Sequence, residues 1–179
     1  MKIKVRVADP AGNITIFVMT ALEKESYPGI ARQILERQEL GGDQVAFVER
    51  TEQGTLRMEM MGGEFCGNAS RSFAYLLCQL SGRERQECLV DVSGSPKPLR
   101  AVADTVKKTS QVDMPLPKET RLLDLGPGEI YDMIVFDGIC HIIVPGKPKK
   151  GEFVEKLLEK AKAECPCCLL YTSDAADEL

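Results

Sequence analysis

The sequence predicts an α+β fold in which many short strands curl around one apolar helix. Strand-like segments are many and helices are few, which favours α+β over a doubly wound fold. The helix predicted over residues 67–80 is largely apolar, and a helix of that kind has to be surrounded by other elements. With 179 residues, of which 44% are hydrophobic and 28% charged, the chain has the composition of a soluble globular domain with a proper core.

The first part of the chain is expected to begin with a β-hairpin. Residues 3–7 and 15–19 have strand-like sequences, and the turn between them, residues 9–13, consists of types that suit tight or left-handed backbone. Apolar residues at helical spacing predict a helix over residues 27–39, which ends at a glycine pair. The elements that follow are strands over residues 45–48 and 55–61 and the helix over residues 67–80.

The second part of the chain is expected to contain short strands separated by turns of glycine, proline and charged residues. These strands are predicted over residues 88–92, 99–103, 111–114, 130–136 and 141–144. A helix over residues 151–162 carries a face of lysine and glutamate, so we expect it to lie on the surface.

Cys66 is the residue on which we expect the chemistry to depend. It comes directly before Gly67 and Asn68, at the predicted start of the apolar helix. The partial positive charge at a helix N-terminus favours a thiolate, and the unpaired amides of Gly67 and Asn68 can hold a substrate carboxylate against the sulfur. The local sequence fits equally well a small buried cysteine followed by a turn.

Charge and cysteine content bear on the class of function. A formal charge of −4 and a pI of about 5.2 argue against nucleic-acid and membrane partners, which usually bind a basic face. No apolar run has membrane-spanning length, and residues 1–5 alternate like a strand instead of opening a signal peptide, so we expect a cytoplasmic protein. The seven cysteines are odd in number and irregularly spaced, which indicates reduced thiols. His141 is the only histidine, so a structural zinc site lacks ligands and no metal is expected.

Three motifs, in this order, resemble the N-terminal half of the diaminopimelate epimerase superfamily. They are Pro-Ala-Gly-Asn at residues 10–13, Gly-Asp-Gln-Val at residues 42–45 and Glu-Phe-Cys-Gly-Asn-Ala at residues 64–69. The resemblance extends from about residue 4 to about residue 164. Within the superfamily, residues 12–16 and 65–69 are more similar to the cofactor-independent histidine racemases of opine-type metallophore synthesis than to true diaminopimelate epimerases.

The resemblance implies an enzyme of two similar domains, each a mixed or antiparallel β-barrel-like sheet around a central helix, with one catalytic cysteine from each domain. Inversion of an α-carbon needs a base on one face and an acid on the other. Cys66 would be the first of two thiols that share this work without a pyridoxal cofactor, and Gly67 and Asn68 would supply half of a cradle for the substrate carboxylate. Asn13 matches a substrate-facing asparagine, and Gln44 matches a second polar position near the site. As alternatives, Asn13 also fits a left-handed turn and Gln44 a strand cap.

Departures from the diaminopimelate pattern point to another amino-acid substrate. The epimerases have an asparagine where this chain has Ile139, and another asparagine ahead of the catalytic cysteine falls on residues 59–61. Without these amides, the second amino and carboxylate groups of diaminopimelate would lack hydrogen-bond partners in the site. This favours histidine or a similar amino acid as the substrate over diaminopimelate. The alternatives are a diaminopimelate epimerase, a cysteine hydrolase with Cys66 as nucleophile and His141 as base, and a thiol-sensing domain without catalysis. Outside the hydrolase hypothesis, His141 is expected to be structural, and the oligomeric state is left open.

The C-terminal residues are predicted to be foreign to the protein. Residues 168–178 resemble the translation of a transposase adapter used in DNA library preparation, and an ordinary acidic disordered tail is the alternative. We therefore expect residues 1–167 to be the N-terminal domain of a longer enzyme and residues 168–179 to be an unstructured artefact. The second catalytic cysteine would lie in the missing C-terminal domain, so the chain alone is predicted not to racemise.

Overall fold

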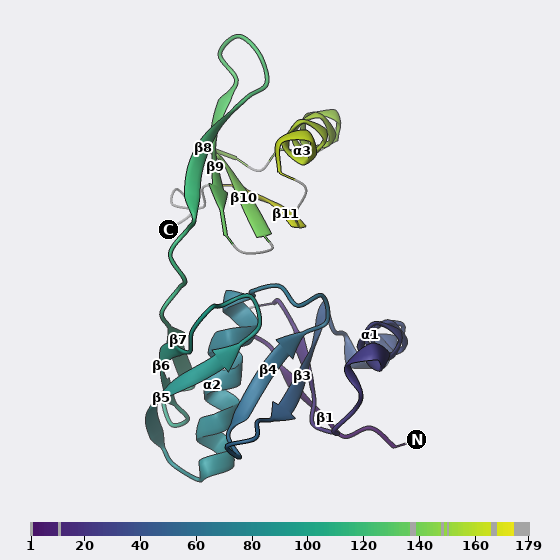
Figure 1. Ribbon diagram of the computed structural model, residues 1–179, viewed down its shortest axis with the longest axis vertical. Coiled ribbons are helices and arrows are strands. Elements are labelled where there is room, and N and C mark those ends of the chain that lie inside the picture. The colour runs from purple at the N-terminus through teal and green to yellow at the C-terminus, as the bar shows by residue number, and fades with distance from the viewer. Residues whose placement is uncertain are drawn as a thin grey trace. The chain divides into compact units, whose positions relative to one another are not determined.

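The computed structural model describes residues 2–10, 12–136, 139–147, 149, 151–165 and 168–173, with only the backbone described for Ile139 and residues 168–173 (Figure 1). The chain divides into two compact units, Met1–Met114 and Pro115–Leu179, which are called unit 1 and unit 2 below. Residues 1–167, predicted as one domain, include two hydrophobic clusters in unit 1 and one in unit 2, and the Pro-Leu-Pro segment 115–117 begins unit 2.

Unit 1 is a seven-stranded mixed sheet with two α-helices. The strands follow one another in space as they do in sequence. They are β1 (Val5–Ala8), β2 (Thr15–Val18), β3 (Gln44–Arg50), β4 (Leu56–Met60), β5 (Arg85–Val92), β6 (Leu99–Asp104) and β7 (Thr109–Val112). The pairs β2–β3 and β4–β5 are parallel, and the other neighbours are antiparallel. The crossovers that parallel pairing requires contain α1 (Tyr27–Leu35) and α2 (Gly67–Ser81).

The two helices of unit 1 pack against opposite faces of β2 and β3. Side chains alternate between the faces along a strand, so Ile16 and Val45 pack with α1, whereas Phe17 and Ala46 pack with α2. Every residue of β2 is therefore buried. Figure 1 shows α1 and α2 on either side of β3 and β4.

The sheet curls around α2 but does not close. α2 contacts β2, β5, β6 and β7, and Phe73 in the middle of the helix is fully buried. Residues of β1, of α2 and of the start of β7 line a cavity of about 590 Å³, to which α2 contributes Tyr75 and Gln79. Leu80, in the last turn of α2, is 50% exposed. The predicted α+β fold with a curled sheet around a central helix is confirmed, but this helix is not buried on all sides because the sheet is open between its edge strands.

The first helix is shorter than predicted. α1 ends at Leu35, not at Glu39, and the 3₁₀ turn η2 (Gln38–Leu40) follows it, just as η1 (Lys24–Ser26) precedes it. Ile30 and Ile34 pack into the core next to β2 and β3. Residues 36–39 are all polar or charged, so they offer no apolar face with which the helix could continue along the sheet.

Unit 2 is a four-stranded sheet with one helix, α3 (Glu152–Glu164). Its strands lie in the order β11-β10-β9-β8 and comprise β8 (Glu119–Asp124), β9 (Ile130–Val135), β10 (Ile139–Val144) and β11 (Cys168–Ser173). β10 and β11 are parallel, and the other neighbours are antiparallel. Leu157 and Ala161 of α3 pack with Leu123, Met133 and Ile142 of the sheet, while the lysines and glutamates of α3 are exposed, as predicted.

Two strands of unit 2 differ from the sequence-based expectation. β8 was not predicted, because Leu123 is its single buried residue and the neighbouring Leu122 is 66% exposed, which leaves little alternation to recognise. The backbone of residues 168–173, predicted to be unstructured, forms strand β11, so that part of the prediction is wrong. Its Leu-Leu-Tyr-Thr run consists largely of strand-forming types, and the edge of β10 is available for parallel pairing. Residues 174–179 lie outside the described residues.

No helix in the described part of the chain is long and apolar enough to cross a membrane.

Candidate active site around Cys66

Cys66 lies at the N-terminus of α2, as predicted. It is the N-cap residue, with extended backbone at φ −132° and ψ 113°, and it is partly buried. The backbone amide of Ala69 donates a hydrogen bond of 3.4 Å to Cys66 Sγ, and the Ser70 hydroxyl donates one of 2.7 Å to the Cys66 carbonyl. The sulfur therefore takes the place that a serine or aspartate oxygen takes at other helix starts, where it faces the positive end of the helix dipole.

The structure brings Asn13 and Gln44 together with Cys66. Cys66 Sγ donates to Gln44 Oε1 at 3.3 Å, and Gln44 Nε2 donates to Asn13 Oδ1 at 2.6 Å. Gln44 Nε2 also donates to Thr15 Oγ1 at 2.8 Å. Thr15 was missed from the sequence, and the parallel register of β2 and β3 places it directly opposite Gln44. Side chains predicted from three separate motifs thus form one hydrogen-bonded chain.

Gly67 and Asn68 form the first turn of α2. Their backbone amides come before that of Ser70, which donates to the Cys66 carbonyl and is the first amide with an acceptor within the helix. The amides of Gly67 and Asn68 therefore point toward any anion bound at the helix start. The Asn68 side chain accepts a hydrogen bond of 3.1 Å from Arg71 Nε, and Arg71 Nη2 donates one of 3.0 Å to the Pro10 carbonyl. Arg71 therefore ties the start of α2 to the turn that carries Asn13. In the sequence, only the i, i+3 spacing between Asn68 and Arg71 points to this role of Arg71, and such spacing is a weak indication.

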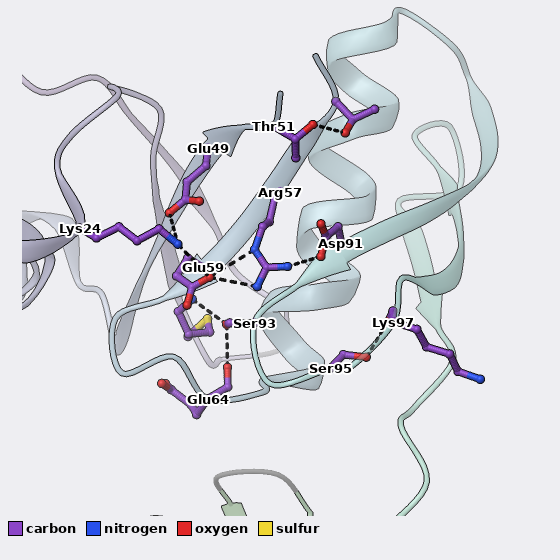
Figure 2. Close-up of polar contacts among 12 residues, drawn as sticks. Lys24, Glu49, Thr51, Arg57, Glu59, Glu64, Asp91, Ser93, Ser95 and Lys97 are labelled. Carbon is purple, nitrogen blue, oxygen red and sulfur yellow. Dashed lines mark hydrogen bonds and ion pairs between the residues drawn. The ribbon is translucent and has the colours of Figure 1, made fainter. Parts of the chain in front are cut away.

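Ser93 holds the segment that leads into Cys66. Its side chain is buried, and its hydroxyl donates to the Glu64 carbonyl at 2.8 Å and accepts from the Met60 amide at 2.9 Å (Figure 2). A buried hydroxyl that pairs two backbone groups fixes their positions, since neither group has water as a substitute. Ser93 lies in a distant part of the sequence, where no local pattern connects it to Cys66.

Met114, the last residue of unit 1, borders the same helix start. A Cβ atom at Gly67 would lie 3.2 Å from Met114 Sδ, which is tighter than ordinary contact. The absence of a side chain at Gly67 therefore lets the thioether pack beside the amides of the first turn. Met114 is 57% exposed, so it forms an apolar border between this turn and solvent.

A cluster of charged side chains joins β3, β4 and β5 (Figure 2). It consists of Lys24, Glu49, Arg57, Glu59 and Asp91. The ion pairs are Arg57 with Asp91, Arg57 with Glu59 at 3.2 Å, and Lys24 with Glu49 at 3.3 Å and with Glu59 at 3.9 Å. The Tyr27 hydroxyl donates to Glu49 at 2.8 Å, and burial together with this hydrogen bond raises the pKa of Tyr27 above its usual range. The cluster therefore links α1 and the turn before it to three strands of the sheet.

The thiols of Cys78 and Cys88 differ from that of Cys66 in their surroundings. Cys78 is fully buried and its Sγ donates to the Arg83 carbonyl at 3.2 Å, while burial, with a contribution from Cys78, raises the pKa of the Cys88 thiol. At neutral pH we expect iodoacetamide to modify Cys66 about ten-fold faster than either of them, because Cys78 is inaccessible and the raised pKa of Cys88 keeps its sulfur protonated. Peptide mass spectrometry of the folded chain measures the three rates. Modification of Cys88 ahead of Cys66 would contradict this order.

His141 lies on β10 of unit 2, with its ring edge-on to Phe136 at a centroid distance of 5.7 Å. Burial lowers the pKa of His141 below its ordinary value, which favours a neutral imidazole in the folded chain. The hydrolase hypothesis needs His141 to lie beside Cys66, which belongs to unit 1, and it stays a prediction. Among the described residues, His, Cys, Asp and Glu side chains do not gather in groups of three or more that could hold a metal ion.

Acid should weaken unit 2 through His141. The unfolded histidine takes up a proton near pH 6.5, and the folded one does so only at lower pH. His141 therefore does not lower the free energy of unfolding above about pH 6.5, but this free energy falls as the pH drops from there toward the folded pKa. We expect hydrogen-exchange protection of the β9 and β10 amides to drop between pH 7.5 and pH 5.5, after correction for intrinsic exchange rates. The drop should be smaller in His141→Gln, and an equal drop in both proteins would show that another group is responsible.

Residues 2–175 of the chain match the family described as the histidine racemase CntK N-terminal domain. The chain belongs to this family. Histidine racemases from two strains of Fusobacterium nucleatum subsp. nucleatum are each 31% identical over 170 residues, which cover 89% of this chain and 63% and 62% of those relatives. The histidine racemase of Staphylococcus aureus strain Mu50 is 26% identical over 159 residues, which cover 84% of this chain and 57% of that relative.

Membership of the family confirms the predicted similarity to histidine racemases, which are isomerases. The wider resemblance to diaminopimelate epimerases stays a prediction. The chain spans 57–63% of the length of the curated relatives that it matches. The family match runs past Cys167 to residue 175, so the adapter origin of residues 168–178 also stays a prediction.

Proposed function

We propose that the chain supplies one of two proton-transfer residues of a cofactor-independent amino-acid racemase, and that this residue is Cys66. The observation that carries the proposal is the position of the Cys66 thiol at the start of α2, between the Gln44 side chain and the Ala69 amide. That position occurs in a chain of the histidine racemase N-terminal domain family.

The helix start suits the chemistry of α-carbon inversion. Loss of the α-proton leaves a carbanion whose charge spreads onto the carboxylate, and preorganised amides stabilise such charge. The amides of Gly67 and Asn68 would bind the carboxylate, while Cys66 would take or give the proton on one face of Cα. A second thiol is needed on the other face, because a single group returns the proton to the face it left. The thiols and amides do this work without a pyridoxal cofactor.

Asn13 and Gln44 are proposed to contact the polar groups of the substrate, since their amides meet beside Cys66. The proposed substrate is histidine, in keeping with the names of the relatives. No observation favours diaminopimelate, a hydrolase or a thiol sensor. A cytoplasmic location and the lack of nucleic-acid and membrane partners stay predictions from the sequence.

The second thiol is proposed to lie in a C-terminal domain that this chain lacks. The support is that the chain matches less than two thirds of each relative, within a family defined as an N-terminal domain. On this proposal the chain alone does not racemise any amino acid, and the uninterrupted reading frame encodes a second Cys-Gly-Ser or Cys-Gly-Thr at a helix start.

The test compares the whole protein, expressed from the uninterrupted reading frame, with the 179-residue chain. Circular dichroism and α-hydrogen exchange in D₂O are followed with L-histidine and with LL-diaminopimelate. We expect the whole protein to invert histidine and the chain alone to invert neither. Racemisation by the chain alone would contradict the two-thiol proposal, and a preference for LL-diaminopimelate would contradict the proposed substrate.

A further inference from the structure

Thr15 is a buried polar residue with a defined role in the hydrogen bonding around Cys66. Its exposed fraction is 0%, and its hydroxyl accepts a hydrogen bond of 2.8 Å from Gln44 Nε2. A buried hydroxyl usually has a hydrogen-bond partner, because burying it without one would lower the stability of the fold. Here the partner is the amide that contacts the candidate catalytic thiol, which gives the pairing a chemical consequence.

The Gln44 amide has one acceptor atom and two N–H donors, and all three are used. Both donors are directed away from the sulfur, toward Asn13 Oδ1 at 2.6 Å and Thr15 Oγ1 at 2.8 Å. The oxygen is consequently the atom that faces Cys66, and it accepts the thiol proton at 3.3 Å. If the amide turned over, both N–H groups would leave their acceptors and Gln44 Oε1 would face Asn13 Oδ1, an oxygen that can only accept. Asn13 therefore selects the orientation of the amide, and the hydrogen bond to Thr15 helps to hold it.

We propose that Thr15 is a positioning residue that, together with Asn13, locks the Gln44 oxygen toward Cys66 and so holds Cys66 as a hydrogen-bonded thiol in the substrate-free protein. This inference rests on the proposed function, in which Cys66 transfers the proton. An oxygen acceptor stabilises S–H and opposes S⁻, whereas an N–H donor would do the reverse.

The helix start acts in the opposite direction. The Ala69 amide donates to the same sulfur at 3.4 Å, and the α2 dipole favours a thiolate. Cys66 thus lies between one group that favours the thiol and one that favours the thiolate. A residue that must give a proton in one direction of a racemisation and take it in the other needs both forms to be accessible.

The charged residues in the segments that meet at this end of α2 are Asp9, Asp43, Glu64, Arg71 and Asp113. Asp9 Oδ1 accepts from the Gly12 amide at 2.6 Å. Asp43 Oδ2 accepts from the Ile14 amide at 2.6 Å, and Arg71 is bound to Asn68 and to the Pro10 carbonyl. Glu64 Oε2 is buried and has no hydrogen-bond partner among the described residues. These charges are retained in all the variants used below. Gln44→Glu adds a charge beside Cys66, so it is compared only with the double variant Gln44→Glu, Thr15→Val.

The test measures iodoacetamide alkylation of Cys66 in the 179-residue chain between pH 6 and pH 10, by peptide mass spectrometry. Thr15→Val removes the acceptor but keeps a similar shape, so the Gln44 amide is free to turn an N–H toward the sulfur. We expect the midpoint of the alkylation profile to move to lower pH and the rate at pH 7.5 to rise about 3- to 10-fold, the effect of one hydrogen bond. Thr15→Ser, which keeps the hydroxyl, should have the profile of the unmodified chain.

A second pair of variants separates the lock from a general loss of structure. Gln44→Glu has acceptor oxygens but no N–H to turn toward the sulfur, so adding Thr15→Val in that background should not lower the midpoint. Cys78, which is fully buried, should stay unreactive in every variant that is folded. Equal profiles for Thr15→Val and the unmodified chain would overturn the proposal, as would an equal downward shift in the Gln44→Glu background. Neither result depends on substrate or on a second domain, so the lock can fail while the racemase proposal stands.

Discussion

Replacing Cys66 by alanine in the whole protein is expected to abolish histidine racemisation. Cys66 is the one cysteine placed by the structure at the start of α2, next to the amides of Gly67 and Asn68 that would hold the carboxylate. Loss of a general acid or base typically lowers a rate about 10²- to 10⁴-fold, and here the other thiol has no partner on the opposite face of Cα. We therefore expect the rate, measured by circular dichroism with L-histidine, to fall by at least about 10²-fold.

Cys88→Ala is the matched control for this substitution. Cys88 is also a partly buried thiol of unit 1, but it lies on β5 among residues that pack around the core. Removal of this thiol should leave the rate within about two-fold, because it takes no part in the proposed proton transfer. A Cys66→Ala protein that racemises at the rate of the Cys88→Ala protein would remove Cys66 from the mechanism.

Among glycine-to-alanine substitutions, Gly94→Ala is expected to lower the free energy of unfolding most. Gly94 has φ +68°, and a Cβ atom there would lie 2.2 Å from the backbone nitrogen of Phe65 and 2.7 Å from the carbonyl carbon of Glu64. Backbone atoms cannot move aside as a flexible side chain can, so the segment that leads into Cys66 must shift. Left-handed strain and overpacking together suggest a loss of about 2–5 kcal/mol in the free energy of unfolding, measured with urea.

Gly54→Ala separates strain from close approach. Gly54 has φ +83°, in the same left-handed region, but nothing lies within 4 Å of a Cβ atom built on it. Its substitution should cost about 1–2 kcal/mol, the strain alone. Gly94→Ala should also change the alkylation rate of Cys66, whereas Gly54→Ala should not. Equal losses of stability in the two variants would show that the contact with residues 64 and 65 is not tight.

Local patterns were sufficient to predict most of unit 1. The alternation in the first hairpin, the helical spacing after residue 27 and the apolar helix behind Cys66 each depend on neighbours in the sequence, and each element is present. The same kind of signal is weak in β8, where Leu122 is exposed beside the buried Leu123, and there prediction failed. β11 was missed because the composition of the tail was interpreted without regard to the available edge of β10.

The candidate site was predictable only in part. Cys66, Gly67 and Asn68 are contiguous, so a helix start could be recognised from them alone. Thr15 and Ser93 could not be found in this way, because their roles depend on partners that are remote in the sequence: Gln44 across the β2–β3 pair, and Glu64 across the segment before α2. A threonine in a strand usually indicates strand propensity, and nothing local distinguishes one that fixes an amide.

The most direct test of the proposed two-thiol racemase is the position and timing of deuterium in histidine. The whole protein is incubated with L-histidine in D₂O, and both enantiomers are analysed at low conversion. Because one group removes the proton and another delivers one from solvent, we expect D-histidine to carry deuterium at Cα while the remaining L-histidine keeps its hydrogen. Cys66→Ser should form no D-histidine. D-histidine without deuterium, or its formation by Cys66→Ser at the rate of the unmodified protein, would contradict the assignment of Cys66 as one of two proton-transfer thiols.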